Sequence, residues 1–308
     1  MARYTALFIS GKTPANQPYL IGVSVAMLFP TIECLSIRQY RSFMTTAVGL
    51  VNWRAGLGTE AKRAKWATDI QGARWRGHWI PFQDQLAGST EHFSPSTVPV
   101  GLSPENPYPH AMNEVIAAYT DLIQLHGVDS KRIILLGDSA GGNICLGTSL
   151  KLRDAFAYLG APAGQILICP WVRDHEPLES SLYDVVSAIG CEVYVEAYTQ
   201  YHPEHVESPY TSPAKAKSLS SLSPMLVFIG GVEILRPSIE RFVERARGEG
   251  TDVKTVLAEG RSHNYFLLDD ISTELDRQDA YREMSEFAQK AHHLFLQAKQ
   301  TSEQIATM

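Results

Sequence analysis

Apolar side chains between residues 109 and 308 recur in two patterns that alternate along the chain. One pattern has the 3.6-residue spacing of amphipathic helices, and the other consists of short continuous runs typical of strands buried on both faces. This alternation predicts an α/β fold with a mostly parallel sheet flanked by helices. The expected strands are 132–136, 165–169, 225–229 and 253–257, and the expected helices are 112–123, 143–154, about 237–247 and 281–295.

The N-terminal hundred residues have a weaker pattern. The apolar stretch Tyr19–Leu35 contains a proline and a glutamate and is short for a bilayer span, so we interpret it as a cap or core helix and leave a weak membrane association open. Asn52–Trp79 is rich in Ala, Lys, Arg and Trp and predicts one or two helices, and Thr97–Leu102 is expected to be extended. We therefore expect a helical N-terminal cap over residues 1–80 and one α/β domain over residues 81–308.

Composition and charge narrow the choice of partners. The 308 residues include 27 Lys plus Arg and 33 Asp plus Glu, which gives a net charge of −6. The chain therefore lacks the positive charge that would predict a nucleic-acid partner. The four cysteines lack the close spacing of a zinc site or redox pair, and the N-terminus lacks the pattern of a secretory signal. We expect a cytoplasmic protein without a metal or cofactor, and the sequence leaves the oligomeric state open.

A glycine-rich pentapeptide joins an expected strand to an expected helix. Gly137–Gly141 matches the pattern G-x-S-x-G, in which a serine stands on a sharp strand-to-helix turn with its hydroxyl exposed. The helix N-terminus adds a partial positive charge, and the N–H of Ala140 faces the position where an oxyanion would form. Ser139 is therefore the predicted nucleophile. The alternative is a glycine-rich turn without chemistry.

A serine nucleophile needs a base, and His263 has the expected position on a loop after the last strands. The alternative for His263 is an ordinary residue of a surface loop. The other histidines considered lie on or beside helices, where a solvated or capping role is expected: His110, His126, His292 and His293.

The third residue should be a carboxylate, because the chain order in this kind of site is Ser, then Asp or Glu, then His. Glu233 follows the expected strand 225–229 and is the predicted acid. Its alternative role is to balance the dipole at a helix N-terminus. Asp252, Asp269 and Asp270 are weaker candidates.

The segment Gly137–Gly142, Gly-Asp-Ser-Ala-Gly-Gly, resembles the hormone-sensitive-lipase-like branch of the α/β-hydrolases. Ser103–Pro109 resembles the loop before the helix that leads to the nucleophile strand, Cys169–Trp171 the Pro-Trp after the next strand, and Gly231–Arg236 the acid loop. Most of that family has Asp at the acid position, and Glu is similar to a subset that includes fungal esterases. Trp75–Trp79 is similar to the cap of fungal sterol-acetate hydrolases and related secondary-metabolite esterases.

The resemblance covers about two thirds of the chain, from Ser94 onward. It implies an α/β-hydrolase fold and cleavage of carboxylic esters of acetyl or short acyl groups without a cofactor. The substrate would be a small hydrophobic ester, with Ser139, His263 and Glu233 as the triad. Acyl transfer, thioester release, or a degenerate hydrolase that only binds a ligand are the alternatives.

One departure from the family concerns the oxyanion hole. Upstream of the nucleophile, the family carries a strand that ends in His-Gly-Gly-Gly, whereas Pro81–Phe93 offers only Ala87 and Gly88. Loss of one oxyanion donor costs a factor of about 10²–10³ in rate. A central strand of the sheet is also expected to be missing, which would leave unpaired edges and a weakened core. Either Gly88 supplies a substitute donor, or the chain is a truncated or mis-spliced product, or the fold has another role.

Overall fold

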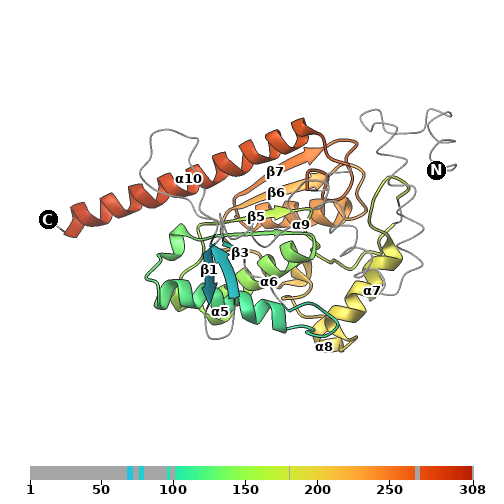
Figure 1. Ribbon diagram of the computed structural model, residues 1–308, viewed down its shortest axis with the longest axis horizontal. Coiled ribbons are helices and arrows are strands. Elements are labelled where there is room, and N and C mark those ends of the chain that lie inside the picture. The colour runs from blue at the N-terminus through green and yellow to red at the C-terminus, as the bar shows by residue number, and fades with distance from the viewer. Residues whose placement is uncertain are drawn as a thin grey trace.

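The computed structural model describes residues 68–71, 76–79, 96–97, 101–179, 181–267 and 271–306. Four parallel strands form the central sheet in the order β4-β5-β6-β7 (Figure 1). Their bounds are β4 Ile134–Asp138, β5 Gly164–Ile168, β6 Met225–Gly230 and β7 Val253–Ala258. All four predicted strands are confirmed. The first strand begins and ends two residues later than predicted. The reason is that Ser130–Arg132 form a 3₁₀ helix, which the Asp129 side chain caps.

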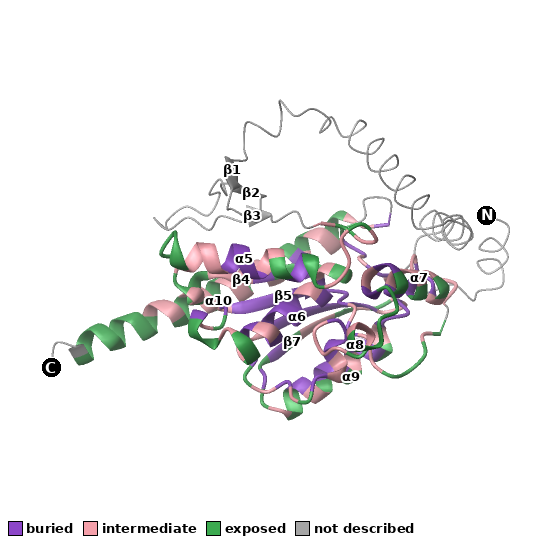
Figure 2. Cartoon of the chain, turned by 90° about the horizontal axis from the view of Figure 1, so that it is seen from below, coloured by how far each residue is buried: buried purple, intermediate pink, exposed green. Residues whose placement is uncertain are grey.

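Helices cover both faces of this sheet. The side chains of each strand alternate between the faces, so Leu167 and Val227 pack with α5, α6 and α9, while Ile166 and Phe228 pack with α10. Figure 2 shows the buried residues gathered on the strands and on the inner sides of the helices. The four predicted helices are confirmed, and their bounds are α5 His110–Gln124, α6 Ala140–Ala155, α9 Arg236–Gly248 and α10 Glu274–Ala306.

The segment between β5 and β6 contains helices that the hydrophobic pattern does not predict. They are α7 Ala188–Thr199, which Ser187 caps through a hydrogen bond from the Gly190 N–H, and the short α8 Pro203–Val206. Two further 3₁₀ helices, Ala157–Leu159 and Pro213–Lys215, flank the sheet. In Figure 1, α7 and α8 lie together on the right of the molecule.

The prediction of helices over Asn52–Trp79 is wrong where the structure describes this segment. Strands β1 Thr68–Gln71, β2 Arg76–Trp79 and β3 Ser96–Thr97 form a small antiparallel sheet, with Thr68 opposite Trp79. The β-branched residues at positions 68 and 70 favour a strand, but the Ala- and Lys-rich composition outweighed them in the prediction. Of the expected extended segment 97–102, residues 101 and 102 have no regular structure. Tyr19–Leu35 and the rest of the predicted cap lie outside the described residues.

The nucleophile strand β4 lies at one edge of the sheet within the described part of the chain, with β5 as its partner there. Its Leu136 side chain is 57% exposed, whereas Leu226 of β6 is 0% exposed. A missing central strand would leave an unpaired edge of this kind.

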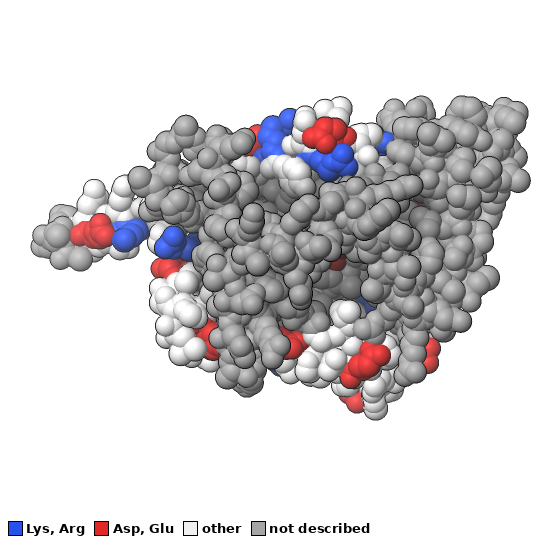
Figure 3. All heavy atoms as spheres, viewed as in Figure 1, with Lys and Arg blue, Asp and Glu red and all other residues white. Residues whose placement is uncertain are grey.

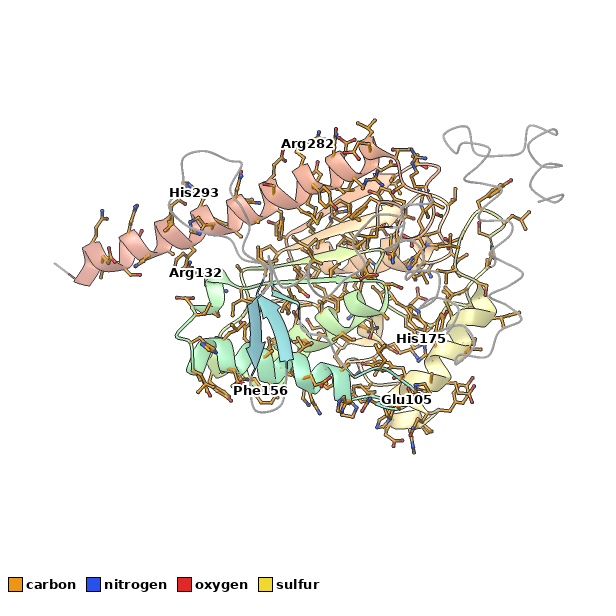
Figure 4. The ribbon with its side chains drawn as sticks, in the orientation of Figure 1. Glu105, Arg132, Phe156, His175, Arg282 and His293 are labelled. Carbon is orange, nitrogen blue, oxygen red and sulfur yellow. The ribbon has the colours of Figure 1, made fainter. Side chains whose placement is uncertain are left out.

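The 33-residue helix α10 extends past the sheet, as Figure 1 shows. In the described residues, no helix combines the length and apolar character needed to cross a membrane. On the face in Figure 3, basic and acidic side chains of the described residues lie close together along the upper edge, where Figure 4 labels Arg282. Arg282 forms an ion pair with Asp279 at 2.9 Å.

Candidate active site

Ser139 stands on a strained turn between β4 and α6. Its φ of 51° and ψ of −114° are unusual for a residue with a side chain. The turn needs glycine at its neighbours, because a Cβ on Gly137 would lie 2.4 Å from the backbone of Gly141, and one on Gly142 would lie 2.8 Å from Pro170. The motif therefore has the tight strand-to-helix geometry that the sequence predicts.

The backbone around Ser139 is tied to the next strand. The Ser139 N–H donates to the carbonyl of Ile168 at 2.8 Å, and the Trp171 N–H donates to the Ser139 carbonyl at 3.0 Å. Ala140, the first residue of α6, is exposed. Among the described residues, none accepts a hydrogen bond from the Ala140 N–H. Within this part of the chain, the Ala140 N–H is a candidate donor to a ligand oxygen.

Glu233 and His263 form a buried hydrogen-bonded pair after β6 and β7. The His263 Nδ1 lies 2.7 Å from the Glu233 Oε2, and the exposed fractions of the two residues are 4% and 3%. The other carboxylate oxygen of Glu233 accepts a hydrogen bond from the Gly230 N–H at 2.8 Å. A carboxylate only accepts hydrogen bonds, so Nδ1 carries the proton and Nε2 is the basic nitrogen. This pairing is what a serine nucleophile requires of its base.

The pKa of His263 is raised above its usual value. Burial by itself lowers the pKa, but the hydrogen bond and charge of Glu233 outweigh it, and the charges of Asp184 and Asp138 act in the same direction. Three carboxylates thus favour the protonated imidazole. A base that gains a proton during a reaction benefits from this environment.

A side-chain bond joins the histidine loop to the serine turn. The Asn264 Nδ2 donates to the Asp138 Oδ2 at 2.9 Å, and the Asn264 N–H donates to the Cys169 Sγ at 3.3 Å. Asp138 directly precedes Ser139, and Asn264 directly follows His263. Within the described residues, however, no hydrogen bond connects the side chains of Ser139 and His263. The two loops are therefore adjacent, but the hydrogen bond that proton transfer from Ser139 to His263 would need is not formed.

The other acid and histidine candidates that the structure describes lie outside this site. Asp252 is 65% exposed and pairs with Lys290, and His110 pairs with Glu114 on α5. His126 is exposed, His292 lies on α10, and Figure 4 shows His293 on the same helix, toward its C-terminal end. Gly88, Asp269 and Asp270 lie outside the described residues.

Two residues with roles at this site were not predicted. Asn264 directly follows His263, but nothing in the sequence indicates its contact with Asp138, which is 126 positions away. Asp184 is a buried carboxylate that contacts the backbone of both triad loops. It lies in the segment 171–224, which has no clear periodic pattern, so the sequence contained no signal for it.

One group of potential metal ligands coincides with the triad. Ligand atoms of Cys169, Glu233 and His263 lie within 4.8 Å of one another. Burial raises the pKa of the Cys169 thiol well above its usual value, and the charge of Glu233 raises it further, so the thiol is protonated and a poor ligand. The 2.7 Å bond between Glu233 and His263 already uses the Oε2 and Nδ1 atoms of the two side chains. The arrangement fits acid–base chemistry better than metal binding.

Comparison with known proteins places this geometry in a family. A family model described as alpha/beta hydrolase fold matches residues 98–267. An esterase of Acinetobacter venetianus is 29% identical over 191 residues, which are 61% of this chain and 61% of that protein. A stretch of 58 residues is 41% identical to the hormone-sensitive lipase of Mus musculus, covering 18% of this chain and 8% of the lipase.

A solved structure agrees at the level of the fold. The thermostable esterase from Pseudomonas putida ECU1011 matches with a TM-score of 0.68 and 22% identity, over 87% of this chain and 95% of that chain. The chain spans about six-tenths of the Acinetobacter esterase and less of the lipase, while the family model covers more than half of the chain. The chain therefore belongs to the α/β-hydrolase fold family, in its hormone-sensitive-lipase-like branch.

Proposed function

We propose that this chain is a serine ester hydrolase that cleaves small hydrophobic esters of short acyl groups. Ser139 is the nucleophile, His263 the general base and Glu233 the acid that orients the histidine. The observation that carries the proposal is the buried 2.7 Å bond between His263 and Glu233, formed next to a strained serine turn. Ester hydrolysis is the chemistry named for the Acinetobacter relative.

The first half of the reaction forms an acyl-enzyme. The Ser139 Oγ attacks the ester carbonyl carbon while the His263 Nε2 takes the hydroxyl proton, and Glu233 holds the resulting imidazolium. Collapse of the tetrahedral intermediate breaks the bond to the alcohol oxygen, which takes the proton from His263. Water then attacks the acyl-enzyme with the same base, releasing the acid and restoring Ser139.

The oxyanion of the intermediate needs N–H donors. The Ala140 N–H at the start of α6 is one proposed donor, supported by its exposure and by the partial positive charge of a helix N-terminus. Gly88 is the proposed second donor, on the ground of the sequence alone. A hole with one donor would work about 10²–10³ times more slowly than one with two.

Labelling with a fluorophosphonate, followed by intact-mass measurement, tests the nucleophile. We expect one label per wild-type chain and none on Ser139→Ala or His263→Ala. Ser302→Ala and His293→Ala serve as matched controls, because both residues are exposed on α10, and they should label like wild type. A labelled chain would then be tested with 4-nitrophenyl acetate, butyrate and octanoate, and the shorter esters should be preferred.

A non-catalytic ligand-binding role is the second candidate. It is favoured by the missing His-Gly-Gly-Gly sequence and by the open contact between the side chains of Ser139 and His263. A chain that is folded by circular dichroism but takes no label would favour this role and exclude the esterase. Acyl transfer and thioester release use the same triad, and they would be distinguished by product analysis with added alcohols and with acyl thioesters.

A further inference from the structure

A buried carboxylate outside the triad lies between the loops that carry Glu233 and His263. Asp184, on the segment between β5 and α7, is 0% exposed. Its Oδ2 accepts a hydrogen bond from the Ile234 N–H at 2.7 Å, and its Oδ1 accepts one from the His263 N–H at 2.9 Å. The Val185 N–H also donates to Oδ1, at 2.8 Å. One side chain therefore holds both the residue after the acid and the base itself.

The donors around Asp184 match a carboxylate better than a neutral side chain. All three partners are N–H groups, and an ionised carboxylate accepts at both oxygens, whereas an asparagine would present an NH₂ group to one of the donors. Removing such a charge from water costs several kcal/mol unless it is compensated. Within the described residues, no Lys or Arg pairs with Asp184, so the compensation comes from the N–H groups and from His263.

The charge at this position faces the catalytic histidine. Burial raises the pKa of Asp184 to about 6, the charge of His263 lowers it, and the charge of Glu233 raises it. The other titratable groups near the pair are Asp138, which faces His263, and two thiols. The Cys191 thiol on α7 faces Asp184, and the Cys169 thiol lies within 4.8 Å of ligand atoms of His263 and Glu233. No cation other than the imidazolium is among these groups.

We propose that Asp184 is a positioning residue of the triad, an inference that rests on the proposed esterase function. Its carboxylate fixes the backbone of Ile234 and His263 so that Glu233 meets the imidazole. Its negative charge, added to that of Glu233, stabilises the imidazolium that forms when Ser139 loses its proton. The segment that carries α7 thus supplies a fourth residue to the catalytic arrangement.

The charge effect can be measured without any activity. The titration of the His263 ring would be followed by NMR in the histidine-labelled full chain, with the signal assigned through His263→Ala. Asp184→Asn should lower the pKa of His263 by roughly 0.5–1 unit, because one of the nearby negative charges is lost. Asp174→Asn is the matched control, since Asp174 lies on the same segment but pairs with Arg241, and it should leave the titration unchanged.

Kinetics then test the positioning role. With 4-nitrophenyl acetate, Asp184→Asn should lower kcat about 10–100-fold with KM changed less than about threefold, because ground-state binding does not use the imidazolium. The acid limb of the kcat/KM profile should move to lower pH. Asp184→Ser, which leaves a small neutral hydroxyl, is a second variant in case the amide disturbs folding.

Each outcome decides the proposal. A folded Asp184→Asn or Asp184→Ser chain with unchanged His263 titration and unchanged kcat would overturn it, as would failure of both variants to fold, which would mark Asp184 as a purely structural residue. A lowered His263 pKa in a chain whose wild type neither labels nor hydrolyses esters would support the placement of His263 by Asp184 and would separately exclude the esterase.

Discussion

The serine turn and the Glu233–His263 corner of this site are built in different ways. The turn follows an edge strand whose Leu136 is 57% exposed, and the exposed Ala140 begins the helix behind it. Glu233 and His263, in contrast, lie on the loops after β6 and β7 and are nearly completely buried. The nucleophile depends on local backbone geometry, whereas the acid–base pair depends on long-range hydrogen bonds. Substitutions at the two places should therefore fail in different ways.

The largest expected effect lies in the buried corner. Glu233→Gln keeps the size of the side chain but removes the charge and allows the wrong histidine tautomer, so kcat should fall about 10³–10⁴-fold. Fluorophosphonate labelling should slow in parallel, while the folded state persists. Glu240→Gln is the matched control, because Glu240 is half-exposed on α9 and pairs with Arg236. An activity loss below tenfold in Glu233→Gln would show that another group orients His263.

Substitutions in the serine turn should lower the stability of the fold. In Gly137→Ala the new Cβ would meet the Gly141 backbone at 2.4 Å, and we expect a loss of about 1–3 kcal/mol in the free energy of unfolding. Urea denaturation of the wild type and the variant measures this difference in the free energy of unfolding. In the control Gly248→Ala, the new Cβ meets no atom within 4 Å, and a stability equal to or above wild type is expected. Equal stability of both variants would contradict the tight packing of the turn.

A smaller effect is expected where the two regions are joined. Asn264→Ala removes the bond to Asp138, which is worth about 1 kcal/mol, and kcat should fall roughly fivefold to tenfold. Asn113→Ala, on the exposed side of α5, should have wild-type rates. Unchanged kcat in Asn264→Ala would show that the two regions are aligned without this bond.

The smallest expected effect is a displacement of the pH profile. The pKa of His263 is raised above its usual value near 6.5, and only the neutral imidazole accepts the serine proton. Ester hydrolysis should therefore fall as the pH drops through the raised pKa, with the midpoint of the acid limb of kcat/KM above 6.5. A midpoint at or below 6.5 would contradict the combined influence of Glu233, Asp184 and Asp138.

The elements of the central sheet could be predicted because their signals are local. Each strand from β4 to β7 is a short apolar run, and α9 places Ile239, Phe242, Val243 and Ala246 on one buried side. The antiparallel strands β1 and β2 were predicted as helix, since short polar strands are stabilised by pairing rather than by composition. Helices α7 and α8 could not be predicted, because the apolar residues of segment 171–224 have no clear helical spacing.

The sequence by itself determined the family motif, the strand order along the chain and the three candidate residues Ser139, Glu233 and His263. These follow from local patterns and from the chain order that the motif requires. Only the tertiary structure decided that Glu233 meets the Nδ1 of His263 in a dry environment, that Asn264 reaches Asp138, and that Asp184 holds both loops. The physical reason is that hydrogen bonds and charge interactions depend on distances between residues up to 126 positions apart in the chain, and folding alone sets those distances.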